Sequence, residues 1–387
     1  MAKKFQAKKS DKFAFGVWCV MNRGGDPFGE DTRPRVSGIE AIKGLAERGV
    51  YGFEFHDNDL IPMDASPRER AKIIAEVQKV MKGTGIKATA ATTNLFYHRV
   101  FKDGAFTSHD PKVRAYAVQK VMANIDVAAE LGSEVYIFWG GREGCEVDVG
   151  KDPIEASKRF RDALNFLCEY VGDQGYPMVF SIEPKPNEPR SDIYLPTAGH
   201  ALAFIATLDH PEMVGVNPEY AHIKMAGLNP LHEFAVALEA GKLVDIHLNA
   251  QKPLRFDQDM SFGADNPKEA LLVVKLLTDY AYAGTKSFDC HPYRTESEPW
   301  DFVERNMKAY KLLEAKVEDV NADTQLCAML EDLTGAADDG WNEVLAGYTA
   351  KGAAKLKAAK FDPAKLATRK LLYERIDQRL TEVLLGA

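Results

Sequence analysis

Residues 135–183, VYIFWGGREGCEVDVGKDPIEASKRFRDALNFLCEYVGDQGYPMVFSIE, contain the pattern that decides the fold. The apolar runs Val135–Trp139 and Met178–Glu183 predict two buried strands, and Ile154–Tyr170 between them has the length and spacing of a helix. Strands that are separated by a helix of this length run parallel, because the helix carries the chain back to the start of the sheet. This stretch therefore predicts one strand–helix–strand unit of a parallel sheet.

The same alternation recurs outward in both directions. The other predicted strands are Phe13–Cys19, Tyr51–Phe55, Lys87–Thr92, Met213–Asn217, Val244–Leu248 and Ser287–Asp289. The other predicted helices include Ala71–Met81, Lys112–Leu131, Gly199–Leu208, Leu231–Ala240 and Lys268–Ala281. A strand–helix unit that is repeated about eight times over roughly 300 residues favours a closed (β/α)8 (TIM) barrel of the α/β class over an open sheet.

The pattern changes after residue 318, where helices continue without a convincing strand. We expect residues 1–318 to form the catalytic barrel and residues 319–387 to form a helical extension that makes subunit contacts. The last predicted helix, 363–385, has an apolar stripe made of Leu366, Leu371, Leu372, Ile376, Leu380 and Leu384. From the pattern alone, this stripe packs either on its own barrel or on a neighbouring subunit.

The composition excludes several classes of protein. A net charge of −8 without a basic stripe argues against nucleic-acid binding. No run approaches the roughly 20 apolar residues of a membrane span, and the first residues lack the apolar segment of a secretory signal, so we expect a cytoplasmic protein. The five cysteines include no CxxC pair, so neither a disulfide framework nor a zinc knuckle is expected. No GxGxxG follows the first strand, which counts against dinucleotide binding.

Polar and aromatic side chains stand where the predicted strands end. They are Trp18, His56, Thr92, Trp139, Glu183, Glu219 (just past its strand), His247 and Asp289. The carboxyl ends of barrel strands meet at one mouth, which is where barrel enzymes place their active sites. The sequence therefore predicts a functional site at this mouth.

Two short motifs add to this set. In SIEPKPNEP (181–189), Glu183 and Lys185 are two residues apart in an extended chain and share a face. In NPEYAH, Glu219 and His222 are three residues apart, a spacing that suits joint capture of one metal ion on a helical turn. If either pair stood alone, a solvent-exposed salt bridge or helix face would explain it at least as well as a functional site.

The predicted site carries a large excess of negative charge. Asp257 and Asp259 alternate in FDQDM and lie within reach of the mouth. With them, the cleft would contain the carboxylates of Glu183, Glu219, Asp257, Asp259 and Asp289, with Lys185 as the counter-charge. Burying this charge without compensation is prohibitive, so the cluster predicts two divalent cations, of which Mg, Mn or Co suit carboxylate and imidazole ligands.

Other residues are expected to act on a substrate. His56 with nearby Asp59 offers an imidazole that a carboxylate orients, as a general base requires. The side chains that we expect to face the substrate are Trp18, Phe28, Thr92, Phe96 and Trp139. Ordinary core packing is the alternative for the aromatic residues, and a structural role is the alternative for His56.

Together these residues resemble the xylose isomerase family, in particular the shorter type that is common in actinobacteria. The matching motifs are FGVW, DPFG, FHDNDL, TTNLF, FKDGAFTS, WGGREG, IEPKPNEPR, GVNPEYAH, FDQDMSFGA and the FD of the eighth strand. The resemblance runs in order from about Phe13 into the C-terminal helices. It implies a homotetramer in which Phe28 reaches into the adjacent subunit's site, and a cis Glu188–Pro189 peptide.

The resemblance also implies roles. The structural metal would be held by Glu183, Glu219, position 247 and Asp289. The catalytic metal would be held by Glu219, His222, Asp257 and Asp259. His56, supported by Asp59, would assist ring opening, and Lys185 would polarise the aldehyde oxygen. The implied reaction is the conversion of D-xylose to D-xylulose, and of D-glucose to D-fructose, by a 1,2-hydride shift with both metals stabilising the alkoxide charge. Trp18 and Trp139 would keep the hydride path dry.

The chain departs from the family at two positions. His247, in VDIHLN, stands where the family has Asp, and His291, in DCHPYR, stands where it usually has Lys. One hypothesis is that His247 still binds the metal and shifts preference from Mg towards Co, Ni, Mn or Fe. The rival is that the first metal is lost or displaced, which leaves a weak enzyme, or a sugar- and metal-binding homologue without turnover. Asp245, on the same strand face, is a candidate to compensate.

Two related metal-dependent barrels are alternative interpretations. An abasic-site endonuclease is disfavoured by the net charge. A ketose epimerase would not need Lys185 beside two metals.

Overall fold

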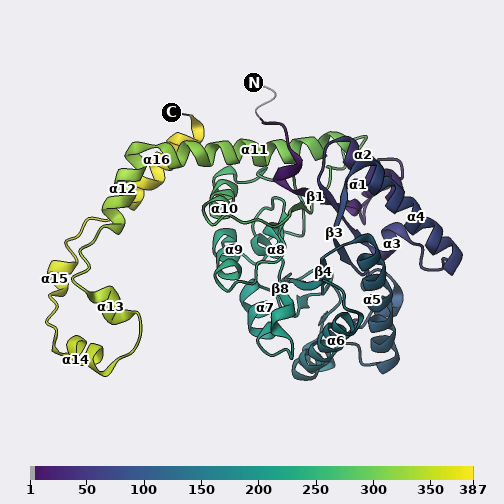
Figure 1. Ribbon diagram of the computed structural model, residues 1–387, viewed down its shortest axis with the longest axis horizontal. Coiled ribbons are helices and arrows are strands. Elements are labelled where there is room, and N and C mark those ends of the chain that lie inside the picture. The colour runs from purple at the N-terminus through teal and green to yellow at the C-terminus, as the bar shows by residue number, and fades with distance from the viewer. Residues whose placement is uncertain (1–4, 387) are drawn as a thin grey trace. The chain divides into compact units, whose positions relative to one another are not determined.

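The computed structural model describes residues 5–386, and the chain divides into two compact units, Met1–Leu313 and Glu314–Ala387 (Figure 1). The sequence placed this boundary at 318/319. Both positions lie within the residues of helix α11 (Trp300–Ala322). In residues 5–386, no helix has both the length and the apolar character that a membrane span requires.

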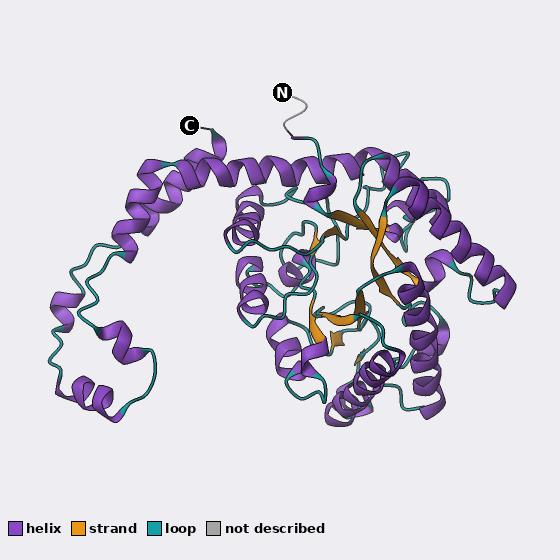
Figure 2. Cartoon of the chain, in the orientation of Figure 1, coloured by secondary structure: helices purple, strands orange, loops and turns teal. Residues whose placement is uncertain are grey.

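The first unit is built around an eight-stranded parallel sheet, drawn in orange in Figure 2. Its strands are β1 (Phe13–Gly16), β2 (Gly52–His56), β3 (Lys87–Thr92), β4 (Val135–Trp139), β6 (Val179–Glu183), β8 (Val214–Val216), β9 (His247–Leu248) and β10 (Lys286–Phe288). The spatial order is β8-β6-β4-β3-β2-β1-β10-β9. Parallel bridges from Val216 to Leu243 and from Glu219 to His247 join β8 to the β9 segment and close the sheet. The predicted TIM barrel is thus confirmed.

Helices surround this sheet (Figure 2). The longer ones are α2 (Gly38–Glu47), α4 (Pro67–Thr84), α5 (Pro111–Leu131), α6 (Pro153–Gln174), α7 (Ala198–Ile205), α9 (Pro230–Glu239) and α10 (Pro267–Asp279). The short helices α1 (Val17–Met21), α3 (Asp57–Leu60) and α8 (Tyr220–Met225) follow strand ends. A two-stranded antiparallel pair, β5 (Gly144–Cys145) with β7 (Asp192–Ile193), lies in the loops.

Five of these barrel helices begin with proline directly after a capping side chain. The caps are Ser66, Asp110, Asp152, Asn229 and Asn266, and each accepts a hydrogen bond from a backbone N–H of the first turn. Proline suits the first helical position because its missing N–H would have no partner there. The apolar pattern predicted that these helices begin one to four residues later than they do, because capping residues and prolines are not part of the apolar periodicity.

The first predicted strand was too long. It was expected to reach Cys19, but β1 ends at Gly16 and the chain turns into α1. A Cβ at Gly16 would lie 2.2 Å from the Trp18 ring, so only glycine permits the ring to fold back over the strand end. Trp18 therefore reaches the barrel mouth from a helical turn.

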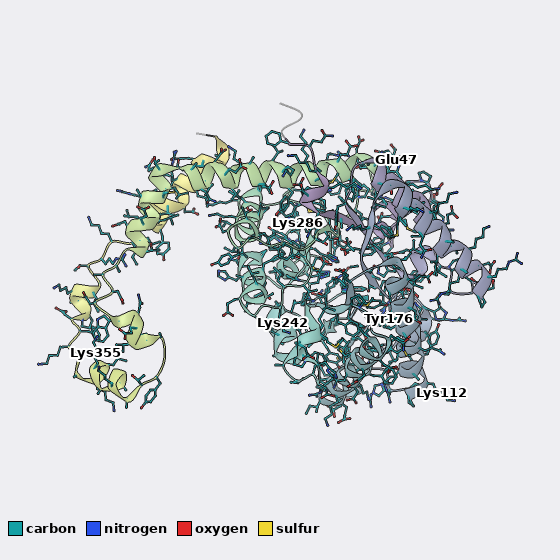
Figure 3. All side chains as sticks on the ribbon, in the orientation of Figure 1. Glu47, Lys112, Tyr176, Lys242, Lys286 and Lys355 are labelled. Carbon is teal, nitrogen blue, oxygen red and sulfur yellow. The ribbon has the colours of Figure 1, made fainter. Side chains whose placement is uncertain are left out.

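Alternation along the strands separates an apolar layer from a polar interior. On β2, Phe53 and Phe55 are fully buried, while Glu54 and His56 point to the opposite face. The core beneath the helices includes the stacked rings of Phe15 and Phe288, 4.8 Å apart. Figure 3 shows that side chains fill the space that the ribbons leave open. The barrel interior at the mouth is consequently the place where buried polar groups collect.

The second unit contains only helices among its described residues. They are the end of α11, α12 (Thr324–Thr334), α13 (Trp341–Leu345), α14 (Ala350–Ala358), α15 (Pro363–Leu366) and α16 (Tyr373–Leu385). The prediction of one helix over 363–385 was wrong, because residues 367–372 are not helical. Leu366 and Leu371 are mostly exposed, so no burial within this unit stabilises a helix through them.

Candidate active site

A cavity of about 220 Å³ opens at the carboxyl ends of the barrel strands. It is lined by Trp18, His56, Thr92, Phe96, Ile137, Trp139, Glu183, Lys185, Glu219, His222, His247, Asp257, Asp259 and Asp289. Of the residues predicted for the site, Asp59 and Phe28 do not line it. The structure thus brings together side chains from eight strand ends, as the barrel topology requires.

The first cluster of possible cation ligands is Glu183, Glu219, His247 and Asp289, whose ligand atoms all lie within 4.8 Å of one another. The Nδ1 atom of His247 lies 3.1 Å from Glu183 Oε2, 3.7 Å from Glu219 Oε2 and 3.4 Å from Asp289 Oδ2. Ligand atoms that surround a divalent cation at about 2.1 Å are separated by about 3 Å, so this spacing suits a cation between them. His247 Nδ1 is buried and has no hydrogen-bond partner among the described residues, which fits an atom reserved for a metal.

A second cluster shares Glu219 and adds His222 and Asp257. His222 Nε2 lies 3.3 Å from both Glu219 Oε1 and Asp257 Oδ2. The spacing of Glu219 and His222 is produced by α8, which begins directly after Glu219. Asp259 lies outside this tight group, but it also lines the cavity.

The cavity is lined by five carboxylates and one ammonium group. Burial raises the pKa of Glu219 and of Asp289 above their ordinary values. Burial, together with the neighbouring Asp257 carboxylate, raises the pKa of Asp259 to about 7. Carboxylates that resist ionisation in this way gain most from a nearby cation. The donor set of carboxylates and imidazoles therefore fits divalent metal ions.

Lys185 is the one ammonium group among the residues that line this cavity. Its Nζ lies 2.6 Å from Asp257 Oδ2 and 5.1 Å from the centre of the Trp139 ring. Burial would lower the pKa of Lys185, but the Asp257 carboxylate outweighs it and raises the pKa above its ordinary value. Lys185 therefore stays protonated and can donate a hydrogen bond into the cavity.

His56 is oriented by Asp59. Asp59 Oδ2 accepts the His56 backbone N–H at 2.8 Å and lies 3.0 Å from the ring Nδ1. An ionised carboxylate only accepts, so Nδ1 carries the proton and Nε2 is left as the basic atom. Burial opposes charge on His56, but the Asp59 carboxylate raises its pKa overall.

The aromatic side chains form a connected wall. The Trp18 ring centre lies 4.5 Å from that of His56, and the Phe96 ring lies 5.6 Å from His56 and 4.6 Å from Trp139. Trp18 Nε1 also donates a hydrogen bond to Asp289 Oδ1 at 2.7 Å. This aromatic wall lines the cavity, and the Trp18 hydrogen bond connects it to the first cluster of possible cation ligands.

Sequence reasoning missed two buried residues of the site, Glu54 and Asn249. Glu54 Oε2 lies 2.9 Å from His247 Nε2. Asn249 Nδ2 donates to Glu219 Oε1 at 2.8 Å and to the Asp289 carbonyl at 2.7 Å. Each of them stands two residues from a predicted site residue on the same strand face, and this alternation was the signal that could have found them.

Two other predicted residues have distinct positions. Phe28 is 99% exposed in a turn that is closed by backbone hydrogen bonds between Asp26 and Gly29, so it does not contact the cavity of its own chain. His291 Nε2 lies 3.5 Å from Asp259 Oδ2, so this imidazole stands beside a predicted metal ligand.

Comparison with known proteins decides the family. The profile described as "Xylose isomerase-like TIM barrel" matches residues 42–309. A xylose isomerase from Thermus thermophilus is 44% identical over 384 residues, which is 99% of each chain. The chain belongs to the xylose isomerase family. It is an enzyme of that family, and the resemblance seen in its motifs is confirmed.

Solved structures agree on the fold. A D-tagatose 3-epimerase-like protein matches 80% of this chain and 100% of its own, with a TM-score of 0.59 and 16% identity. A 3-keto-D-glucoside 4-epimerase from E. coli matches 79% of this chain and 99% of its own, with a TM-score of 0.56 and 16% identity. At this identity they show a shared barrel and no more.

The Glu188–Pro189 peptide is cis, as the resemblance to the xylose isomerase family implied.

Proposed function

We propose that this xylose isomerase family member converts D-xylose to D-xylulose, and D-glucose to D-fructose, after opening the sugar ring. The observation that carries the proposal is one cavity in which two adjoining cation clusters are flanked by an oriented imidazole and a buried ammonium. An epimerase has no evident use for the Lys185 ammonium beside two metals, and an abasic-site endonuclease is disfavoured by the net charge of −8.

Two divalent cations, Mg, Mn or Co, fit the clusters. One would be held by Glu183, Glu219, His247 and Asp289, and the other by Glu219, His222, Asp257 and Asp259. Bound there, they supply Lewis-acid stabilisation of the negative charge that develops on the sugar oxygens.

The chain's own groups move and hold protons. His56 Nε2, freed for this role by the Asp59 contact at Nδ1, accepts the proton of the anomeric hydroxyl as the C1–O5 bond breaks, and returns it to the ring oxygen O5. Lys185 then donates a hydrogen bond to the aldehyde oxygen, which makes the carbonyl carbon a better hydride acceptor. The charged state of Lys185 is secured by Asp257.

Apolar surfaces protect the hydride path. Trp18, Phe96 and Trp139 cover one side of the cavity, and Thr92 lines it as a polar neighbour. With water excluded, hydrogen moves between C2 and C1 without exchange with solvent.

We infer that His247 remains a metal ligand. Its free Nδ1 faces three carboxylate oxygens, and an imidazole softens a set that would otherwise be all oxygen. Metal preference should therefore move from Mg towards Co, Ni, Mn or Fe. A His247→Asp variant is expected to recover relative preference for Mg, and a variant without that gain would count against His247 as a ligand.

A homotetramer is part of the proposal. Phe28 projects away from its own subunit, and several large apolar side chains of the second unit are more than half exposed: Leu345, Tyr348, Phe361, Leu366, Leu371, Tyr373 and Leu385. Where such side chains form a continuous surface, a partner usually covers it. A cytoplasmic location agrees with five free thiols, three of them buried.

The test is isomerisation of D-xylose by chelator-treated protein that is resupplied separately with Mg, Mn and Co. We expect turnover of D-xylose to D-xylulose with at least one of these metals. In a separate assay with D-fructose as the substrate, we expect that no epimerised ketose forms. A folded protein that binds metal without turnover would support the rival hypothesis, a sugar- and metal-binding homologue that has lost catalysis.

A further inference from the structure

Glu54 is a buried carboxylate that the proposed reaction does not use. It lies on β2 between Phe53 and Phe55 and is 1% exposed. A carboxylate on a buried strand is costly unless a specific partner holds it. Its partner is His247, whose Nε2 lies 2.9 Å from Glu54 Oε2.

This contact selects one tautomer of His247. An ionised Glu54 can only accept a hydrogen bond, so Nε2 must carry the ring proton. In the neutral ring, which is the form that binds a metal, Nδ1 then has a free lone pair, and this is the atom that faces the oxygens of Glu183, Glu219 and Asp289. A histidine that binds a metal through one nitrogen commonly donates its other N–H to a carboxylate, which fixes the ring and raises its basicity.

The contact also fixes the ring plane. Without an acceptor at Nε2, rotation about the Cβ–Cγ bond would turn carbon Cδ2 towards the three carboxylates in place of Nδ1. Glu54 removes this freedom, because the opposite ring orientation leaves its carboxylate without the N–H.

We propose that Glu54 is the positioning residue of the first cation cluster, acting through His247 to present Nδ1 as a metal ligand. This inference rests on the proposed function, since it assumes that a cation binds between His247 and the three carboxylates. It assigns no metal contact to Glu54 itself.

A competing role for Glu54 is visible in the structure. Asp245 is 1% exposed, and its Oδ2, like Glu54 Oε1, has no hydrogen-bond partner among the described residues. Glu54, Asp245 and His247 place ligand atoms within 4.8 Å of one another. If these three residues bound a cation of their own, Glu54 would be a ligand, and removing it would delete one bound ion.

The experiment titrates Co²⁺ alone into chelator-treated, full-length protein and records the number of ions, their dissociation constants and the visible absorption spectrum. Glu54→Gln keeps the shape of the side chain but weakens the acceptor. We expect the same number of ions, a 10- to 100-fold weaker dissociation constant for one of them, and an altered spectrum of that ion. Glu54→Asp, which keeps the charge, should give a smaller loss and serves if the first variant does not fold.

Two controls separate positioning from packing. In a His247→Asp background, Glu54→Gln should no longer weaken Co²⁺, since the residue through which Glu54 acts is gone. Glu143→Gln removes an equally buried carboxylate, 3% exposed, that accepts backbone N–H groups of Ala105, Phe106 and Thr107. It should lower thermal stability while changing the Co²⁺ dissociation constants by less than about twofold.

Several outcomes would overturn the inference. The first is an unchanged Co²⁺ affinity in Glu54→Gln. The second is the loss of one bound ion in Glu54→Gln while the affinity for the others is unaffected. The third is that Glu54→Gln weakens Co²⁺ binding equally in the wild-type and His247→Asp backgrounds. The proposed function is judged separately, from the wild-type protein. If that protein bound a single ion, the two-metal proposal would fail, and the dependence of that ion on Glu54 would still decide the inference. If it bound none, both would fail.

Discussion

Lys185 Nζ lies 2.6 Å from Asp257 Oδ2, and Asp257 is also 3.3 Å from His222 Nε2. One carboxylate thus connects the buried ammonium to the second cation cluster. The contact holds Lys185 against the Trp139 ring at the lining of the cavity. A cation on His222 and Asp257 and a hydrogen bond from Lys185 would act on the same part of a bound sugar.

Replacing Lys185 should impair the chemical step more than binding. We expect Lys185→Gln to lower kcat by about 10²- to 10³-fold, because a preorganised donor in a dry site contributes that much to an oxyanion-type transition state. Steady-state kinetics with D-xylose at saturating metal measures this effect. Lys224→Gln is the matched control, since Lys224 is also buried and paired, 2.9 Å from Glu269, but does not line the cavity. Equal losses of kcat in both variants would contradict the role of Lys185.

Asp59 should set the acid side of the pH profile. The pKa of His56 is raised because the Asp59 carboxylate outweighs the effect of burial. A base acts in its neutral form, so activity falls as the pH drops through this raised pKa. Asp59→Asn lowers the pKa, and the acid limb of kcat/KM should move to lower pH, while the plateau falls about 10- to 100-fold as ring orientation is lost.

Asp103 offers a control with the same local geometry. It accepts the His109 backbone N–H at 2.8 Å and lies 2.9 Å from the His109 Nδ1, outside the cavity. Asp103→Asn should leave the pH profile of kcat/KM in place. An acid limb that stays at the wild-type pH in Asp59→Asn would show that His56 is not the group that titrates.

Metal removal should make stability depend on pH. The pKa values of Asp259, Glu219 and Asp289 are raised in the folded protein, that of Asp259 to about 7. The folded state therefore holds more protons than the unfolded state at mildly acidic pH, and its stability falls as the pH rises through the folded values. We expect the Tm of the chelated protein to drop between pH 5 and 8 by about 5 °C or more, since 1 kcal/mol moves the Tm by about 2–4 °C in large domains. Calorimetry of the metal-loaded protein should show a smaller change of Tm with pH. An equal change of Tm with pH in the loaded and chelated proteins would contradict cation binding at the two clusters.

Phe28 tests the subunit arrangement. Because this side chain is 99% exposed in its own chain, Phe28→Ala should leave the stability of the isolated fold unchanged. If Phe28 completes a neighbour's site, KM for D-xylose should rise several-fold. Val149→Ala changes a side chain that is 96% exposed and is the control. An unchanged KM for D-xylose in a tetrameric Phe28→Ala variant would contradict the proposed role of Phe28. A wild-type protein that is monomeric in analytical ultracentrifugation would also contradict it.

The barrel was predictable because its signals are local. Short apolar runs mark the strands, and the bounds of all eight predicted strands agree with the structure to within three residues. The first strand was predicted to extend beyond Gly16, where the chain in fact turns, because this glycine lets the Trp18 ring pack back over the strand end. The prediction of one last helix over 363–385 was wrong because it rested on the apolar stripe alone. Leu366 and Leu371 belong to this stripe, but they are mostly exposed within their unit.

The candidate site was predictable where residues stand at strand ends, because a barrel gathers all strand ends at one mouth. Glu54 could not be assigned in this way. Its partner His247 is 193 positions away, and FEFH has the pattern of an ordinary strand with one charged residue. Only the folded barrel, in which β1 and β10 separate β2 from β9, shows that the two side chains meet across its interior. Sequence patterns predict which face a side chain takes, but not which partner it finds there.

The most direct test of the central claim is to follow D-xylose deuterated at C2 through the metal-loaded enzyme in ordinary water. A dry cavity with a hydride shift predicts D-xylulose that retains the deuterium at C1. Loss of the deuterium to solvent would mean that a base removes it as a proton, and would contradict the assigned roles of Lys185 and the aromatic wall. Recovery of unchanged D-xylose from folded, metal-bound protein would contradict the isomerase itself.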